Sequence, residues 1–395
     1  MIDPKVLFLT YAFPPVNAPR SVQISRLLKY ADLNPDLVCG VGHYQNDANL
    51  YPEAVDQLKS VHRVPFTKRQ ETWAKIKRKQ PFGMLKDPDL FYPWVKKAVK
   101  ETWKIFNHDV LVSFGSPMSV HLGALKIKRK TGVKWIACFS DPWADNPFNN
   151  FSPALSRKVL KAEKLVFEQA DKLFFNTPET IDLVMKKYNG AYRDKCGILP
   201  HSFDPELYPD ASPPEEAPLI FRYIGHFYGN RSPEPLLDAL LKLPKAQREK
   251  IHVECYGGYA PSMIGNPAYK ELLGSTVSFH KAVPYQESLA LMKTAHALLV
   301  IDAPADISVF LPSKLVDYIG SGRPIMGITP PGASDRILKS LGQPTSDTSD
   351  VDSIVANLSA CIEQLSASQA PASYEQQDYH PKHVGEILSS AINSF

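Results

Sequence analysis

Short apolar runs, each followed by a loop and then by a segment with helical periodicity, recur along nearly the whole chain. The first run is Lys5–Thr10, and the apolar residues of Ser21–Tyr30 behind it are spaced as on one face of a helix. A continuous apolar run of this length is typical of a strand buried on both faces of a parallel sheet. Alternating strands and helices of this kind predict doubly wound α/β domains, which bind ligands beyond the carboxyl ends of their strands.

A segment rich in Pro, Glu, Asp and Ser separates two copies of this pattern and indicates a linker over residues 205–218. A chain of 395 residues is long enough for two domains. We therefore predict an N-terminal Rossmann-like domain over residues 1–204 and a C-terminal one over residues 219–370. Residues 371–395 are expected to form a polar linker and a terminal helix.

The stretch Ser308–Pro330 is typical of a loop, a helix, a tight turn and a short buried strand. Ser313 is the natural N-cap, because its hydroxyl can accept a hydrogen bond from a free backbone N–H, and Gly322 is suited to ending the helix. The positive end of a helix dipole can hold a phosphate, and Lys314 in the first turn adds a full positive charge. Asp317, about one turn further on, could accept hydrogen bonds from ribose hydroxyls. The competing interpretation is a buried helix, turn and strand with an ordinary glycine cap.

The segment PSKLVDYIGSGRPI, residues 312–325, resembles the nucleotide-sugar segment of GT-B glycosyltransferases of family 4. It is most similar to the bacterial polysaccharide-biosynthesis branch, whose pattern is Pro-Ser-Lys-Leu-x-Glu-Tyr-x-x-x-Gly-x-Pro. The resemblance covers nearly the whole chain and implies the GT-B fold, in which two Rossmann-like domains face an interdomain cleft and the terminal helix returns to the N-terminal domain. Asp317 stands where the family has a ribose-binding glutamate, whereas Val309 stands where the family has a glutamate that contacts the sugar.

The resemblance also assigns a donor-binding role to the first loop of the C-terminal domain. In the family this loop brings glycine and a basic residue to the donor diphosphate, and Gly225, Gly229 and Arg231 match it in kind. Glycine lets the backbone approach the phosphate, and arginine is a forked hydrogen-bond donor. Arg231 and Lys314, which come from separate loops, could together neutralise one diphosphate. The expected donor-binding residues are Gly225, His226, Gly229, Arg231, Val283, Pro312, Ser313, Lys314 and Asp317.

Loops of the N-terminal domain are expected to form the acceptor side. The loop after the first strand keeps the Phe-Pro-Pro of the family and leads to Arg20, which we expect to contact an anion; the alternative is a solvated loop arginine. Asp141 ends a predicted strand in a Ser-Asp-Pro-Trp segment similar to that of the polysaccharide branch, where it would orient or deprotonate the attacking hydroxyl; the alternative is a structural loop cap. His121 is expected to be a packed or surface residue. The expected acceptor-side residues are Pro15, Arg20, Ser116, Asp141 and Trp143, and the expected catalytic residues are Asp141, Arg231 and Lys314.

The resemblance implies a glycosyltransferase that moves a sugar from a UDP- or GDP-linked donor to a hydroxyl acceptor, lipid-linked or polysaccharide, in polysaccharide or glycolipid biosynthesis. Members of the family retain the anomeric configuration and need neither a metal nor a cofactor beyond the nucleotide sugar. Two rival interpretations stay open. Val309 favours a catalytically silent module that binds a nucleotide sugar or a protein partner, and a GT-B sugar-nucleotide epimerase or hydrolase is the second rival.

Charge and cysteine usage bear on partners and location. A net charge of +4 permits an anionic substrate or membrane surface without requiring nucleic acid, and no nucleic-acid-binding motif is present. Residues 68–85 combine Lys and Arg with aromatic residues, which is typical of peripheral contact with an anionic membrane or, alternatively, of a solvated basic helix. The five cysteines lack metal-ligand spacing and indicate free thiols in a reducing compartment. No apolar run is long enough to span a bilayer and no secretion signal is evident, so we expect a cytoplasmic protein, at most peripheral on the inner face of the cytoplasmic membrane.

Overall fold

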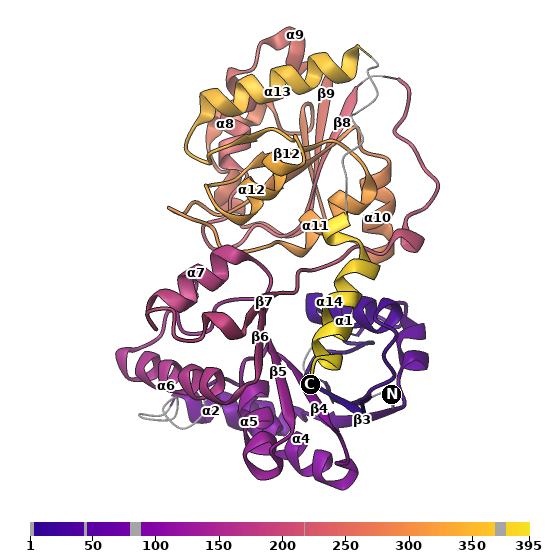
Figure 1. Ribbon diagram of the computed structural model, residues 1–395. Coiled ribbons are helices and arrows are strands. Elements are labelled where there is room, and N and C mark those ends of the chain that lie inside the picture. Colours follow the sequence, from indigo (N-terminus) through magenta and orange to yellow (C-terminus); the bar gives the residue numbers. More distant parts are fainter. Residues whose placement is uncertain (1–3, 43–45, 80–87, 217, 368–376) are drawn as a thin grey trace. The chain divides into compact units, whose positions relative to one another are not determined.

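The chain forms two compact units, each built on its own parallel sheet (Figure 1). The computed structural model describes residues 4–42, 46–79, 88–216, 218–367 and 377–395. The first unit consists of the residues up to Ser202 together with Pro381–Phe395, and the second unit is Phe203–His380. The predicted α/β class, with two doubly wound Rossmann-like sheets, is confirmed.

The sheet of the first unit has seven parallel strands in the order β3-β2-β1-β4-β5-β6-β7. The strand order reverses between β1 and β4, which pair from Val6 with Val110 to Leu9 with Ser113. In doubly wound sheets such a switch point opens a crevice at the carboxyl ends of the strands. The strands are β1 (Val6–Leu9), β2 (Asp36–Val41), β3 (Ser60–Pro65), β4 (Val110–Phe114), β5 (Lys134–Cys138), β6 (Lys172–Phe175) and β7 (Cys196–Ile198).

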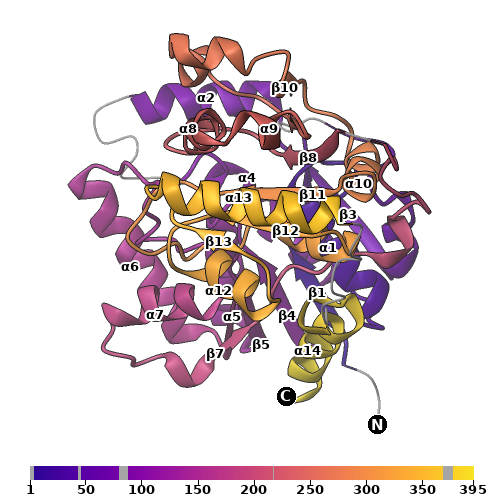
Figure 2. The same cartoon turned by 90° about the horizontal axis from the view of Figure 1, so that it is seen from above.

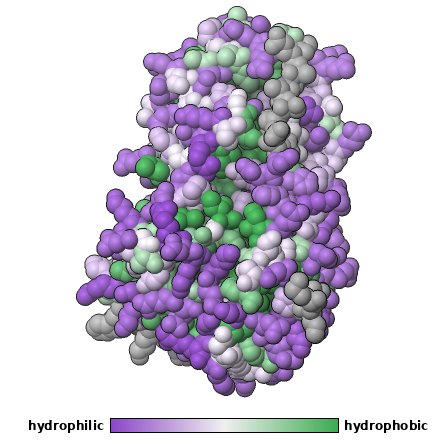
Figure 3. All heavy atoms as spheres, viewed as in Figure 1, coloured by the Kyte–Doolittle hydropathy of each residue, from purple (hydrophilic) through white to green (hydrophobic). Residues whose placement is uncertain are grey.

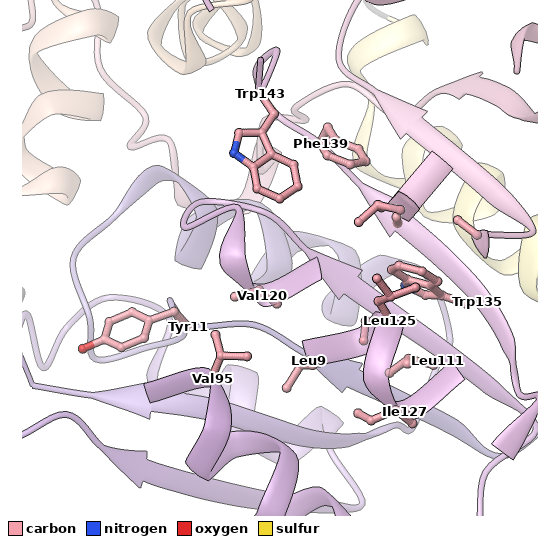
Figure 4. Packing of buried hydrophobic residues seen from close by; sticks show 14 of the residues in the cluster. Leu9, Tyr11, Val95, Leu111, Val120, Leu125, Ile127, Trp135, Phe139 and Trp143 are labelled. Carbon is pink, nitrogen blue, oxygen red and sulfur yellow. The ribbon is translucent and has the colours of Figure 1, made fainter. Parts of the chain in front are cut away.

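Successive side chains of a strand point to opposite faces of the sheet, so the apolar strands of this sheet expose apolar side chains on both faces. Helices cover both of these faces. Leu9 and Leu111 face one cluster, which contains Val95 of α4 and Leu125 of α5 (Figure 4). The C-terminal helix, α14, packs against α1 (Figure 1). The helices are α1 (Pro19–Tyr30), α2 (Lys68–Lys79), α4 (Tyr92–Ile105), α5 (Ser119–Thr131), α6 (Pro153–Gln169), α7 (Pro178–Lys186) and α14 (Pro381–Asn393), with 3₁₀ turns at Pro52–Gln57 and Arg193–Lys195.

The sheet of the second unit has six parallel strands in the order β10-β9-β8-β11-β12-β13. Its order reverses between β8 and β11, so its crevice is expected beyond the ends of these two strands. The last strand, β13, contains only two residues and was too short to be predicted from periodicity. The strands are β8 (Leu219–Ile224), β9 (Ile251–Tyr256), β10 (Val277–His280), β11 (Ala297–Ile301), β12 (Ile325–Ile328) and β13 (Thr345–Ser346).

Alternate residues of β11 face two different hydrophobic clusters. Leu299 and Ile301 pack with residues of α8 and α13, which lie side by side in Figure 2, whereas Leu298 and Val300 pack with residues of α10, α11 and α12. Both faces are therefore covered, as a parallel sheet requires. The helices are α8 (Glu234–Lys242), α9 (Lys245–Arg248), α10 (Tyr285–Lys293), α11 (Ser313–Ser321), α12 (Ala333–Ser340) and α13 (Val351–Ser366), with 3₁₀ turns at Pro205–Leu207, Pro261–Ile264, Pro267–Glu271 and Gln377–Tyr379.

The segment predicted as a linker, residues 205–218, makes specific contacts with the second unit. The hydroxyl of Tyr208 donates to the backbone carbonyl of Asp317 at 2.8 Å, and Arg323 Nη2 donates to the carbonyl of Ala211 at 3.4 Å. These bonds fix the segment against α11 and the turn that follows it.

The visible surface is largely hydrophilic and the cysteines are unpaired, as the composition indicates. Hydrophilic residues cover most of the face shown in Figure 3. Among the described residues, none of the helices has both the length and the apolar character needed to cross a membrane. All five cysteines are free thiols, as predicted, and only Cys196 is not fully buried.

Candidate functional site

Helix α11 begins without a side-chain cap at the carboxyl edge of the second sheet. The N-cap is Pro312, in an extended conformation, and Ser313 is already helical. The prediction that Ser313 is the N-cap is therefore wrong by one residue, and its hydroxyl does not cap the helix. The backbone N–H of Leu315 donates to the carbonyl of Pro312 at 3.0 Å. Because proline has no side-chain acceptor, no N-cap side chain takes up the N–H groups of Ser313 and Lys314, which a ligand could use.

The ammonium of Lys314 is buried beside the loop that follows β8. Its Nζ lies 3.8 Å from the centroid of the Tyr223 ring, a cation–π contact, and it has no hydrogen-bond partner among the described residues. Burial, and then the neighbouring Arg231, lower the pKa of Lys314 well below its usual value, while Asp302 opposes the shift. An ammonium held in this way lacks an anion partner.

Gly225 provides the space that Lys314 occupies. Its φ of 155° is rarely adopted by residues with a side chain, and a Cβ at this position would lie 3.2 Å from Lys314 Nζ. The backbone conformation thus favours the glycine predicted from the family motif, and a side chain here would also press against Lys314. Gly257 lies even closer to Gly225 than Lys314 does, because a Cβ added to Gly257 would be 2.1 Å from the carbonyl oxygen of Gly225.

Arg231 and Asp302 meet at the switch point of the second sheet. Arg231 comes from the loop after β8, Asp302 follows β11, and Nη2 of the arginine lies 3.3 Å from Oδ1 of the aspartate. Arg231 Nε and Asp302 Oδ2 are buried and have no partner among the described residues. With Lys314, the cluster contains two cations and one carboxylate, so a bound anion would complete its charge balance.

Asp317 lies in the second turn of α11 and is almost completely buried. Its Oδ1 accepts a hydrogen bond from the hydroxyl of Tyr285 at 3.2 Å. The structure therefore gives the predicted ribose-binding carboxylate a tyrosine neighbour that the sequence did not indicate. Val283 lies two residues before this tyrosine, in the loop between β10 and α10.

The remaining donor-side positions lie around this cluster. His226 and Gly229 are exposed in the loop after β8, and Gly229 has a φ of 59°, in the left-handed region. Val309 is buried, so the position where the family has a sugar-contacting glutamate is filled by packed apolar atoms. The structure thus brings Gly225, Arg231, Lys314 and the start of α11 together, and adds Asp302 to them.

Arg20 occupies the corresponding place in the first unit. It lies in the first turn of α1, is 4% exposed, and donates through Nε to the carbonyl of Gly115 at 2.8 Å and through Nη1 to Gln23 Oε1. The alternative of a solvated loop arginine is wrong. Burial lowers the pKa of Arg20 to about 10, and Nη2 has no partner among the described residues.

Asp141 lies beyond the end of β5, within electrostatic range of Arg20. Burial raises the pKa of its carboxyl group, and Arg20 and a hydrogen bond from Ser140 Oγ at 3.2 Å oppose that shift. A carboxylate whose pKa is raised toward neutrality is a better proton acceptor near physiological pH. Arg20 and Asp141, predicted separately, therefore belong to one electrostatic group.

The other acceptor-side positions differ in their surroundings. Trp143 is buried in the hydrophobic cluster of the first unit (Figure 4), so its contacts are those of a core residue. Ser116 is exposed at φ 76° between β4 and α5, and Pro15 accepts a hydrogen bond from the backbone of Asp47 through its carbonyl.

A buried histidine stands at the same edge. His121 of α5 packs on Phe139 at 4.2 Å, as the packed alternative predicted, and its Nδ1 lies 2.9 Å from Ser113 Oγ, which accepts from Trp135 Nε1 at 2.8 Å. Burial lowers the pKa of His121 to about 3. His201, after β7, is also buried, with a pKa lowered to about 3, and lies 3.1 Å from the amide of Asn176. The sequence places His201 in a turn behind a strand but does not assign it a role.

Comparison with known proteins identifies the fold. No protein-family model and no curated protein sequence matches the chain. Solved structures do match: Anabaena Alr3699/HepE in complex with UDP and glucose has 15% identity and a TM-score of 0.65, covering 99% of this chain and 100% of that one. The lipopolysaccharide outer core galactosyltransferase WaaB has 14% identity and a TM-score of 0.63, covering 99% of each chain.

The similarity extends to an enzyme of another class. UDP-GlcNAc 2-epimerase from Neisseria meningitidis, bound to UDP-GlcNAc, has 11% identity and a TM-score of 0.61, with 99% of this chain and 100% of that chain covered. Together with the two parallel sheets, these likenesses show that the chain has the GT-B fold. Because one fold supports several chemistries, its function has to be argued from the site.

Proposed function

We propose that this protein is a glycosyltransferase that moves a sugar from a nucleoside diphosphate sugar to a hydroxyl acceptor. The observation that carries the proposal is the buried ammonium of Lys314, which has no hydrogen-bond partner among the described residues and lies at the uncapped start of α11 together with Gly225 and Arg231. A diphosphate offers several acceptor oxygens and negative charge, which is what this group of donors lacks. Asp302 offsets only one of the two positive charges.

These residues suit the chemistry of sugar transfer. When the bond between the sugar and the diphosphate breaks, negative charge grows on the leaving group, and fixed cations stabilise it without reorganisation. Asp141 would orient or deprotonate the attacking hydroxyl from the first unit. We propose that the enzyme belongs to family 4 of the GT-B glycosyltransferases, retains the anomeric configuration and needs no metal. Where Asp141 only orients the hydroxyl, the leaving donor phosphate receives the acceptor proton.

A UDP-linked donor is the first to test. HepE was crystallised with UDP and glucose, and WaaB is named a galactosyltransferase of lipopolysaccharide. These names, and the Pro312–Lys314 motif, support a role in polysaccharide or glycolipid biosynthesis with a lipid-linked or polysaccharide acceptor.

The experiment has two stages. Thermal melts with UDP, GDP, CDP and their common sugar conjugates should show stabilisation by one nucleotide series, because a ligand that binds only the native state raises its stability. Release of the free nucleotide from the matching sugar conjugate should then depend on an added hydroxyl acceptor. If no nucleotide in the panel raises the melting temperature, the proposal is wrong.

A second candidate function follows from Val309. Its buried apolar side chain leaves the sugar without a carboxylate from that position, which favours a module that binds a nucleotide sugar without turning it over. Such a module would be stabilised by the nucleotide sugar but would release no nucleotide with any acceptor. An epimerase or hydrolase would convert or cleave the nucleotide sugar in water alone.

We also propose that α2 makes peripheral contact with an anionic membrane. The helix starts with a reciprocal capping box between Thr67 and Gln70, and Trp73 and Ile76 are 63% and 47% exposed on a lysine- and arginine-rich helix. Exposed aromatic and aliphatic side chains among basic ones suit a membrane interface. Residues 80–85 of the predicted basic segment lie outside the described residues. A cytoplasmic location with this peripheral contact is part of the proposal.

A further inference from the structure

Asp302 has an oxygen that nothing in the described structure uses. The residue follows β11 directly, is 4% exposed, and its Oδ1 lies 3.3 Å from Arg231 Nη2. Its Oδ2 is buried without a partner. Burying a carboxylate oxygen without a hydrogen-bond donor costs free energy, because the oxygen loses its hydrogen bonds to water. The presence of such an oxygen here therefore indicates that a ligand supplies the donor.

The hydroxyl of Thr329 is a second polar group without a hydrogen-bond partner among the described residues, and it lies directly after the neighbouring strand, β12. The backbone N–H of Asp302 donates to the carbonyl of Ile328 at 3.0 Å, which continues the register in which Ile301 pairs with Ile328. Asp302 and Thr329 are therefore adjacent across the sheet, on the same face. Thr329 is 1% exposed, and its Oγ1 also lacks a partner among the described residues.

The unused atoms divide into two kinds. Lys314 Nζ and Arg231 Nε are donors and need an acceptor-rich anion, whereas Asp302 Oδ2 needs a hydrogen-bond donor, and Thr329 Oγ1 can serve either way. The diphosphate group of a nucleotide sugar carries no P–OH at neutral pH, so by itself it would satisfy only the two cations. A sugar 1-diphosphate satisfies both kinds, because its hydroxyls lie directly beside its phosphates.

We propose that Asp302 is a specificity-determining residue for the donor sugar, which it recognises by accepting a hydrogen bond from one sugar hydroxyl through Oδ2. Oδ1 meanwhile holds Arg231 toward the diphosphate, and Thr329 Oγ1 bonds the sugar beside it. Asp302 thereby supplies, from the end of β11, the carboxylate that Val309 cannot provide. This inference rests on the proposed binding of a nucleotide sugar, and it adds the residue that reads the sugar.

The test compares affinities for a nucleotide and for its sugar conjugate in Asp302→Asn. Isothermal titration with UDP and UDP-glucose, and with the GDP pair if wild type prefers it, gives the ratio of the two dissociation constants. We expect the variant to bind the free nucleotide at least as tightly as wild type, because it removes a negative charge next to the phosphate site. Its affinity for the sugar conjugate should fall by about tenfold relative to the free nucleotide, the effect of losing a hydrogen bond to a charged group.

Deoxy analogues of the sugar make the test specific. One monodeoxy UDP-glucose should bind wild type about tenfold more weakly than UDP-glucose, and this difference should vanish in Asp302→Asn. Asp306→Asn is the matched control, because it removes an exposed carboxylate from the same loop; it should leave the ratio unchanged. Thr329→Val, which keeps the shape and removes the hydroxyl, should lower sugar-dependent affinity without changing nucleotide affinity.

Three results would overturn the inference. Equal weakening of nucleotide and sugar conjugate by Asp302→Asn would mean that Asp302 acts only by positioning Arg231. An unchanged ratio in both Asp302→Asn and Thr329→Val would remove both residues from the sugar site. If wild type binds nucleotides but no conjugate better than its deoxy analogues, no hydroxyl is read, whereas absence of any nucleotide binding would instead refute the proposed function.

Discussion

Nη2 of Arg231 lies 3.3 Å from Oδ1 of Asp302, across the point where the strand order of the second sheet reverses. The first unit repeats this relationship with different chemistry: Nε of Arg20, from the helix after β1, donates to the carbonyl of Gly115, beyond the end of β4. In each unit an arginine behind the first strand is thus held by a group behind the strand on the other side of the switch point. This is the position at which doubly wound sheets bind ligands.

Lys314→Met should weaken nucleotide binding without destabilising the ligand-free protein. The ammonium is buried and has no hydrogen-bond partner in the part of the chain that the structure describes, so an apolar side chain of similar length should leave the ligand-free melting temperature equal or higher. Turnover should fall by roughly 100-fold or more, because a preorganised cation at the leaving diphosphate is lost. Lys339→Met, at an exposed lysine of α12, is the control for charge alone.

The same lysine predicts a pH dependence. Since burial lowers the pKa of Lys314 in the native state, the unfolded state binds more protons at any pH between that lowered pKa and the ordinary value of 10.5. The stability of wild type relative to Lys314→Met should therefore increase as the pH rises through this interval. Melting curves of both proteins from about pH 7 to about pH 9 measure how the stability of wild type relative to the variant changes with pH. If wild type became more stable relative to the variant as the pH falls, the lowered pKa would be contradicted.

Asp141→Asn should lower turnover while leaving donor binding intact. If the carboxylate orients or deprotonates the acceptor hydroxyl, kcat should fall by about 100-fold, and the affinity for the nucleotide should not change. Because burial raises the pKa of Asp141, wild-type kcat should decline as the pH falls through that raised value. Full activity in the variant would indicate the structural loop cap instead.

Gly257→Ala should be strongly destabilising, since its Cβ would lie 2.1 Å from the carbonyl oxygen of Gly225 and its φ is 136°. We expect a loss of roughly 2–4 kcal/mol from this backbone clash and conformational strain. Gly274→Ala is the matched control, because φ is also positive at 82° but nothing lies within 4 Å of the added Cβ. Its loss should be about 1–2 kcal/mol, the cost of the conformation alone. Urea unfolding of the two variants separates clash from strain.

His121 should remain neutral far into the acid range. Burial, with a smaller contribution from Arg20, lowers the pKa of His121 from 6.5 to about 3. Between these two pH values the native state therefore binds fewer protons than the unfolded state. This histidine's contribution to the free energy of unfolding should therefore decrease as the pH falls from 6.5 toward 3. Imidazole resonances followed by NMR should show no protonation of His121 while the protein is folded above about pH 4; titration near pH 6 would contradict its burial.

Trp73→Ser should weaken binding to vesicles that contain anionic lipid. Loss of an exposed indole from a basic helix should reduce the bound fraction severalfold, and neutral vesicles should bind neither protein. Phe395→Ser, which removes another exposed aromatic residue of the first unit, is the control. Sedimentation with vesicles provides the measurement, and identical binding by both variants and wild type would favour the solvated helix.

The sequence by itself determined the fold class, most strand positions and the two cations of the candidate donor site. Apolar runs such as Lys5–Thr10 specify parallel strands through local hydrophobicity, and Gly225 and Lys314 belong to short motifs whose chemistry is local. The N-cap of α11 was misplaced by one residue because a serine and a preceding proline are both compatible with a helix start, and only the backbone conformation distinguishes them.

Only the tertiary structure decided which distant residues meet. Asp302 is 71 residues from Arg231, and Tyr285 is 32 residues from Asp317, and neither pairing leaves a periodic or motif signal along the chain. Arg231 and Asp302 meet because parallel strands align their carboxyl ends at one edge, so strand order, rather than sequence distance, sets the neighbours. Tyr285 and Asp317 meet because α10 packs against α11. Burial likewise depends on packing from all sides, which is why the pKa values of Lys314, Asp141 and His121 follow from the folded structure alone.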